Sequence, residues 1–204
     1  MATVIKRAEV AGPAGRIEAA LDEPNGAPVG VAALCHPHPV HGGTMDNKVI
    51  QTLSRAFVQL GYRAVRFNFR GVGASQGQWD EGQGEVDDAL AVVSAFRDAA
   101  LPLALGGFSF GGYVAAEVAA RLANSGSPAR LVLVGPATST FKMAAAAPNT
   151  LVIHGEADDV VPLQATLDWA RPQQLPVVVL PGVGHFFHGQ LTRLRDLVVQ
   201  AWSR

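Results

Sequence analysis

Ser109 lies in a stretch of sequence that could turn its hydroxyl into a nucleophile. Residues 107–111 read Gly-Phe-Ser-Phe-Gly, between an apolar run at 101–105 and an alanine-rich amphipathic stretch at 113–124. A tight turn from a strand into a helix would push the serine hydroxyl outward, and such a turn favours glycine on both sides of the serine. The N-terminus of the following helix would stabilise negative charge that develops there. The chain has 22 glycines, so the pattern also arises by chance and needs support from other residues.

Candidate acids and bases follow Ser109 along the chain. A serine hydroxyl is a weak nucleophile at neutral pH and needs a base within hydrogen-bond reach. His185 and His188 can fill that role, because a neutral imidazole takes the serine proton and later returns it to the leaving group. Asp158 and Asp159 can supply the carboxylate that orients the imidazole and stabilises its charged form. Together these residues predict acyl transfer by a Ser-His-Asp triad.

Two other motifs suggest different chemistry. His36, His38 and His41 lie in a loop rich in proline and glycine, and such a cluster could bind a metal ion. The further aspartate and histidine ligands of a metallohydrolase are missing beside it, so we expect no metal. Residues 70–77 resemble a dinucleotide fingerprint, but no helix is expected before about residue 84 to hold the phosphate. We therefore also expect no cofactor.

The hydrophobic pattern predicts an α/β fold that brings these side chains together. Residues 4–10 and 16–21 flank a turn and predict an antiparallel hairpin. Further strands are expected at 29–35, 62–69, 101–105, 130–134, 151–153 and 176–180, and helices at 46–60, 85–99, 110–124, 162–170 and 189–202. This alternation predicts a mainly parallel central sheet with helices on both faces, in which functional groups gather at the carboxyl ends of the strands. The connection at 137–149 is too short for an inserted subdomain.

Composition narrows the class of protein further. The length of 204 residues predicts a single domain, 1–204, and the 49% hydrophobic and 16% charged residues indicate a globular protein. The net charge of −1 gives no basic surface for nucleic acid, and no apolar run is long enough to span a membrane. The N-terminus shows no signal peptide and the single cysteine, Cys35, cannot form an internal disulfide, so we expect a cytoplasmic protein. The sequence gives no oligomeric state.

The order serine, acid, histidine, together with three shorter motifs, resembles the α/β-hydrolase superfamily over nearly the whole chain. The likeness is strongest to small lidless bacterial serine hydrolases, through the His-Pro loop at 36–39, the Asn-Phe-Arg-Gly stretch at 68–71 and the His-Phe-Phe-His ending at 185–188. This resemblance implies an α/β-hydrolase fold without a lid domain. Its acid follows a His-Gly-x-x-Asp pattern, which favours Asp158 over Asp159, and its base follows a mobile loop at a strand end, which favours His185 over His188. In that family Arg70 is a structural anchor.

The resemblance also implies an oxyanion hole and a substrate pocket. Two backbone N–H groups are needed, one from the residue after the nucleophile, which is Phe110, and one from the loop after an earlier strand. Pro37 has no N–H, so His38 is the expected second donor. Aromatic side chains near the serine and the histidine are candidates for an apolar acyl pocket: Phe108, Phe110, Phe186, Phe187 and Trp79.

The function implied is that of a serine esterase, a carboxylesterase that cleaves small acyl esters through an acyl-enzyme intermediate. The expected partner is a small-molecule acyl substrate in an open cleft. Thioesters, amides and perhydrolysis are alternative reactions of the same triad. An alternative of another class is a non-catalytic binding protein with this fold, although such proteins usually lack one triad residue and none is missing here.

Overall fold

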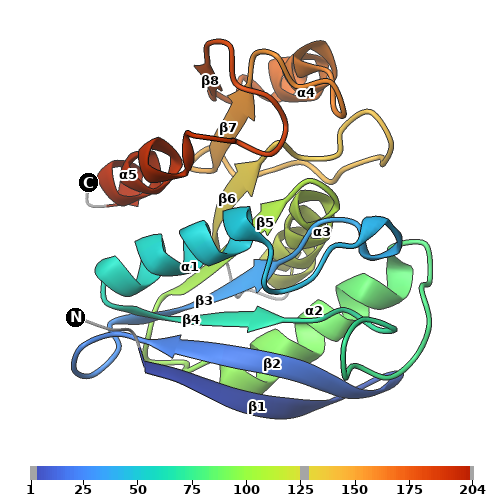
Figure 1. The fold of residues 1–204 in the computed structure, drawn as a ribbon, viewed down its shortest axis with the longest axis vertical. Coiled ribbons are helices and arrows are strands. Elements are labelled where there is room, and N and C mark those ends of the chain that lie inside the picture. Colours follow the sequence, from blue (N-terminus) through green and yellow to red (C-terminus); the bar gives the residue numbers. More distant parts are fainter. Residues whose placement is uncertain (1–3, 125–128, 203–204) are drawn as a thin grey trace.

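The computed structural model describes residues 4–124 and 129–202, which form one sheet covered by helices (Figure 1). The sheet order among these residues is β1-β2-β4-β3-β5-β6-β7-β8. The strands are β1 (Val4–Gly12), β2 (Gly15–Glu23), β3 (Gly30–Cys35), β4 (Tyr62–Phe67), β5 (Leu103–Phe108), β6 (Arg130–Val134), β7 (Leu151–Gly155) and β8 (Val177–Leu180). The helices are α1 (Lys48–Gln59), α2 (Gln83–Phe96), α3 (Phe110–Asn124), α4 (Leu163–Ala170) and α5 (Leu191–Trp202), with short 3₁₀ helices η1 (Pro39–His41) and η2 (Arg171–Gln173).

The pairing of the strands confirms the expected fold class. Strands β1 and β2 form an antiparallel hairpin, and β2 also pairs antiparallel with β4. The pairs β3–β4, β3–β5, β5–β6, β6–β7 and β7–β8 are all parallel. Between β6 and β7 the described chain forms only turns and extended segments, so no helical lid is built into this connection. None of the described helices is long and apolar enough to cross a membrane.

Alternation along the strands gives each face of the sheet its own core. In β3, Val31 and Ala33 pack with α2 and α3, whereas Ala32 and Leu34 pack with α1 and α5 on the opposite face. Strand β4 ends at Phe67 rather than Phe69, and the Phe69 amide donates to the ring of His36 instead of to a neighbouring strand. Both faces of the central strands are therefore buried, and polar side chains are found at the ends of these strands.

A buried ion pair fixes the start of α1, which borders the site. The Arg66 guanidinium on β4 lies 2.7 Å from Asp22 on β2 and 2.8 Å from Asp46, and it also donates to the Met45 carbonyl. The Ser54 hydroxyl of α1 donates to the same Asp22 carboxylate. Asn47 then caps α1, since its side-chain oxygen accepts from the Val49 and Ile50 amides. One guanidinium thus connects two strands to the loop that leads into α1.

We expect Arg66→Met to lower the free energy of unfolding by about 3–5 kcal/mol, because it leaves the buried Asp22 carboxylate without its counter-ion. Arg63→Met is the matched control on the same strand. Its guanidinium pairs with Glu23 but is 32% exposed, so its loss should be about 1 kcal/mol or less. Urea unfolding of both variants measures the difference, and equal losses would contradict this account of Arg66.

Candidate active site

Ser109 stands on a tight turn between β5 and α3. Its φ of 55° lies in the left-handed region, which non-glycine residues rarely adopt. A Cβ added at Gly107 would lie 2.0 Å from the Gly111 carbonyl oxygen, and one at Gly111 would lie 2.0 Å from the Cys35 carbonyl oxygen. The Ser109 amide donates to the Val134 carbonyl at 3.0 Å, which ties the turn to the end of β6. The two glycines of the sequence motif are thus required by backbone contacts on both sides of the serine.

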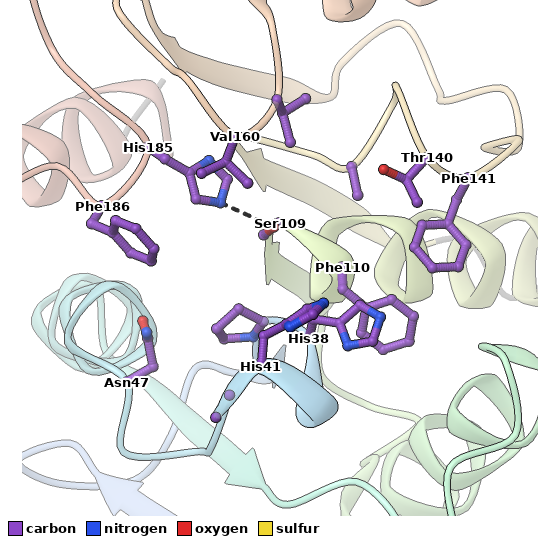
Figure 2. A pocket seen from close by; sticks show the side chains of 15 residues that line it. His38, His41, Asn47, Ser109, Phe110, Thr140, Phe141, Val160, His185 and Phe186 are labelled. Atoms are coloured by element: carbon purple, nitrogen blue, oxygen red, sulfur yellow. Dashed lines mark hydrogen bonds between the residues drawn. The ribbon is translucent and has the colours of Figure 1, made fainter.

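The ends of β5, β7 and β8 bring Ser109, Asp158 and His185 into one hydrogen-bonded chain. His185 Nε2 lies 3.0 Å from the Ser109 hydroxyl, as Figure 2 shows, and His185 Nδ1 lies 2.7 Å from Asp158 Oδ2. The carboxylate can only accept, so Nδ1 carries the proton and Nε2 is free to accept the serine proton. All three side chains are buried. The arrangement has the geometry of a nucleophile, a base and an orienting acid.

The surroundings of Asp158 keep its carboxylate ionised. Burial alone would raise its pKa, but hydrogen bonds from His185 and from the Val161 and Val160 amides outweigh burial, so the pKa of Asp158 lies below its usual value. The two amides lie 2.7 Å and 3.0 Å from Oδ1. The alternative acid and base are placed elsewhere, because Asp159 and His188 are both exposed and neither joins this chain of hydrogen bonds.

His36 shapes the loop that carries the candidate oxyanion donor His38. Its ring is fully buried, with Nδ1 donating to the Pro37 carbonyl at 2.7 Å and Nε2 accepting from the Phe69 amide at 3.1 Å. The His41 and Gly43 amides in turn donate to the His38 carbonyl. Within the described residues, neither the His38 amide nor the Phe110 amide donates a backbone hydrogen bond, so both are available to a ligand.

A cavity of about 580 Å³ opens over Ser109. Figure 2 shows Phe186 and Asn47 on one side of the serine and Thr140 and Phe141 on the other. Phe110 and Phe186 line the cavity, and Phe186 is 49% exposed. The complete lining comprises Pro37, His38, His41, Gly42, Gly43, Asn47, Ser109, Phe110, Ala137, Thr140, Phe141, Val160, Val161, His185 and Phe186. Asn47, Thr140, Phe141 and Val160 also line the cavity and were not predicted from the sequence, because none of them belongs to a recognised motif.

Three residues expected in the pocket, Phe108, Phe187 and Trp79, do not line the cavity but lie behind its wall. Phe108 belongs to the core beneath the candidate base, with its ring centroid 4.8 Å from that of His185, because it points into the sheet face covered by α1 and α5. Phe187 is buried in the same core. Trp79 packs against the rings of His38 and Phe110 at 4.6 Å and 5.1 Å and supports them from behind.

The motifs that suggested a metal or a dinucleotide have structural roles. Both ring nitrogens of His36 are already hydrogen-bonded, and the described His, Cys, Asp and Glu side chains form no group of three that could hold a metal ion. Arg70 forms a bidentate pair with the buried Asp88 and so anchors the loop after β4 to α2. Arg70 also fills the space above Gly84, where an added Cβ would lie 1.9 Å from its guanidinium.

Comparison with known proteins gives consistent matches. The family described as "Serine aminopeptidase, S33" matches residues 38–149. A crystal structure from Xanthomonas campestris, described as an a/b serine hydrolase without lid, is 38% identical with a TM-score of 0.89, and the match covers 98% of this chain and 94% of that one. An alpha-beta serine hydrolase homologue from Coxiella burnetii is 39% identical with a TM-score of 0.84, over 98% of both chains.

A curated relative, an uncharacterized protein of Rickettsia prowazekii (strain Madrid E), is 41% identical over 114 residues. That match covers 54% of this chain and 48% of the relative, so it spans about half the length of the curated protein.

His36 should make stability depend on pH. Burial lowers its pKa from 6.5 to about 4, although the hydrogen bond to Pro37 acts in the opposite direction. Between these values the unfolded chain binds more protons than the folded one, so the free energy of unfolding falls as pH decreases from about 6.5 to about 4, by about 3 kcal/mol in total. Urea unfolding at stepped pH measures this slope, and His36→Gln should reduce it. Parallel pH curves for the two proteins would contradict the assignment.

Proposed function

The chain belongs to the α/β serine hydrolase family, and on that premise we propose that it cleaves small acyl esters with Ser109 as nucleophile, His185 as base and Asp158 as orienting acid. The observation that carries the proposal is the chain of hydrogen bonds from the Ser109 hydroxyl through His185 to Asp158, at 3.0 Å and 2.7 Å. A buried serine hydroxyl against a histidine that is itself oriented by a carboxylate is the arrangement that activates serine for acyl transfer.

The proposed reaction has two halves. His185 Nε2 takes the Ser109 proton while Oγ bonds to the ester carbonyl carbon, and the carbonyl electron pair moves onto oxygen, where the Phe110 and His38 amides donate to it. Collapse breaks the bond to the alcohol, which leaves with the proton from His185. Water then attacks the acyl-enzyme with His185 again as base, the acid is released, and Ser109 regains its proton.

The residues that line the cavity favour neutral esters as substrates over compounds with a free amino group. An aminopeptidase must bind an ammonium group, which calls for a carboxylate near the scissile bond. The described residues that line the cavity include no Asp or Glu, and its walls are formed mainly by backbone, aromatic and small side chains. Thioesters, other amides and perhydrolysis remain alternatives on the same triad. We also propose a cytoplasmic location, which suits a protein with a single cysteine.

A fluorophosphonate probe tests the proposed nucleophile and separates an enzyme from a non-catalytic binding protein. We expect folded protein to form one adduct on Ser109, and Ser109→Ala to form none and to lose ester hydrolysis by about 10⁴-fold or more. Peptide mapping by mass spectrometry locates the adduct. Folded protein that stays unlabelled under conditions where a control serine esterase reacts would remove the enzymatic proposal.

A series of p-nitrophenyl esters tests the size of the acyl group. On one side of the cavity Phe141 packs against other aromatic rings and closes the wall, whereas the side at Phe186 is open. We therefore assign the acyl group of the substrate to the Phe141 side and the alcohol group to the Phe186 side. We expect kcat/KM to be highest for short acyl chains and Phe141→Ala to shift the optimum to longer chains. Phe186→Ala is the matched control and should leave acyl preference unchanged. A wild-type optimum beyond about ten carbons would contradict this assignment.

A further inference from the structure

His154 is a fully buried histidine that the proposed reaction leaves unused. It lies on β7, and its side chain reaches the acid of the proposed triad from the side away from the cavity. Its Nε2 is 2.9 Å from the Val161 carbonyl oxygen and 3.4 Å from Asp158 Oδ2. Asp158 Oδ2 therefore has two imidazoles beside it, His185 on the substrate side and His154 behind.

The partners of His154 fix where its proton lies. The Val161 carbonyl can only accept a hydrogen bond, so Nε2 carries the proton. Nδ1 is buried and has no hydrogen-bond partner among the described residues, which leaves it unprotonated. Burial lowers the pKa of His154, and the nearby His185 lowers it further. The hydrogen bond to Val161 and the charge of Asp158 act in the opposite direction but do not outweigh burial, so the pKa lies below its usual value. The ring is thus neutral, and its one N–H donates to the Val161 carbonyl while lying 3.4 Å from Asp158 Oδ2.

This N–H holds the turn that carries Asp158. The Val161 amide donates to Asp158 Oδ1 while the Val161 carbonyl accepts from His154, so the two residues hold both polar groups of Val161. Rotation of the carboxylate would lengthen its 2.7 Å hydrogen bond to His185 Nδ1.

We propose that His154 is a positioning residue for the proposed hydrolysis. Its Nε2–H donates to the Val161 carbonyl, so that the turn keeps the Val161 amide on Asp158 Oδ1 and the carboxylate in line with His185. The inference rests on the proposed function for its kinetic consequences, and on geometry alone for its effect on the Asp158–His185 hydrogen bond. The charged and titratable groups that face His154 are Asp158 and His185.

Paired variants test this role. Gln can place an amide N–H near the position of Nε2, Asn reaches only near Nδ1, and Leu supplies no donor. We expect His154→Gln to keep kcat within about threefold of wild type, and His154→Leu and His154→Asn to lower kcat about tenfold or more with little change in KM. In the latter two, the Val161 carbonyl loses its donor, the turn loosens and the Asp158 carboxylate is less well aligned with His185. A less well aligned carboxylate stabilises the imidazolium less, so the acid limb of the kcat/KM profile moves to lower pH.

Proton NMR gives a readout that requires no substrate. The His185 Nδ1–H proton lies in a 2.7 Å hydrogen bond to Asp158, so we expect its signal at low field. The signal should keep its position in His154→Gln and move in His154→Asn and His154→Leu. Ile153→Val, the neighbouring buried position on β7, is the control for general loosening of the strand and should change neither the signal nor the pH profile. Should His154→Leu fail to fold, the Gln and Asn variants decide the matter alone.

Failure of the His154 role and failure of the proposed function give different results. If His154→Asn and His154→Gln match each other in kcat, pH profile and NMR signal, His154 has no positioning role and the inference is overturned. If wild-type protein shows no hydrolysis and no fluorophosphonate adduct, the proposed function fails, and the NMR comparison still reports whether His154 orients Asp158 against His185.

Discussion

Contact between backbones at Gly111 sets the geometry on which the candidate site depends. The first turn of α3 approaches the end of β3 so closely that a single Cβ would overlap the Cys35 carbonyl oxygen. This approach holds the Phe110 amide beside the loop that carries His38, and it forces Ser109 into a φ of 55°. The strain is held in place by bonds from the Ser109 amide to β6 and from the Gly112 amide to the Ser109 carbonyl. The surrounding fold, rather than the backbone preference of serine, therefore turns Ser109 toward the cavity.

Strand ends explain why much of this arrangement can be predicted from sequence. Apolar runs mark the buried strands, and the polar residues directly after β5, β7 and β8 have to meet at one edge of a parallel sheet. Glycines at 107 and 111 indicate the turn because no other residue fits there. The fold class and the meeting of Ser109, Asp158 and His185 follow from these local patterns. The preference for Asp158 over Asp159 came from the family pattern. In the structure the Asp158 carboxylate accepts from the amides of residues 160 and 161, whereas Asp159 is exposed.

The walls of the cavity could not be predicted in the same way. Neighbours in sequence point to opposite sides, so Phe186 faces the cavity while Phe187 and Phe108 enter the core. Phe141 and Asn47 reach the cavity from loops whose course depends on distant contacts, such as the Arg66 ion pair for the start of α1. The position of His154 behind Asp158 likewise depends on how β7 and the turn at 158–161 fold together. Long-range packing, rather than local pattern, decides which side chains meet a substrate.

The most direct test of the account is to follow the first turnover with p-nitrophenyl acetate. Because p-nitrophenolate is a good leaving group, we expect acylation of Ser109 to be faster than deacylation, so that p-nitrophenol appears in a burst of about one equivalent per protein molecule and the rapidly quenched protein carries one acetyl group on Ser109. Hydrolysis without an acetylated Ser109 in the quenched protein, or acetylation confined to another residue, would contradict the account.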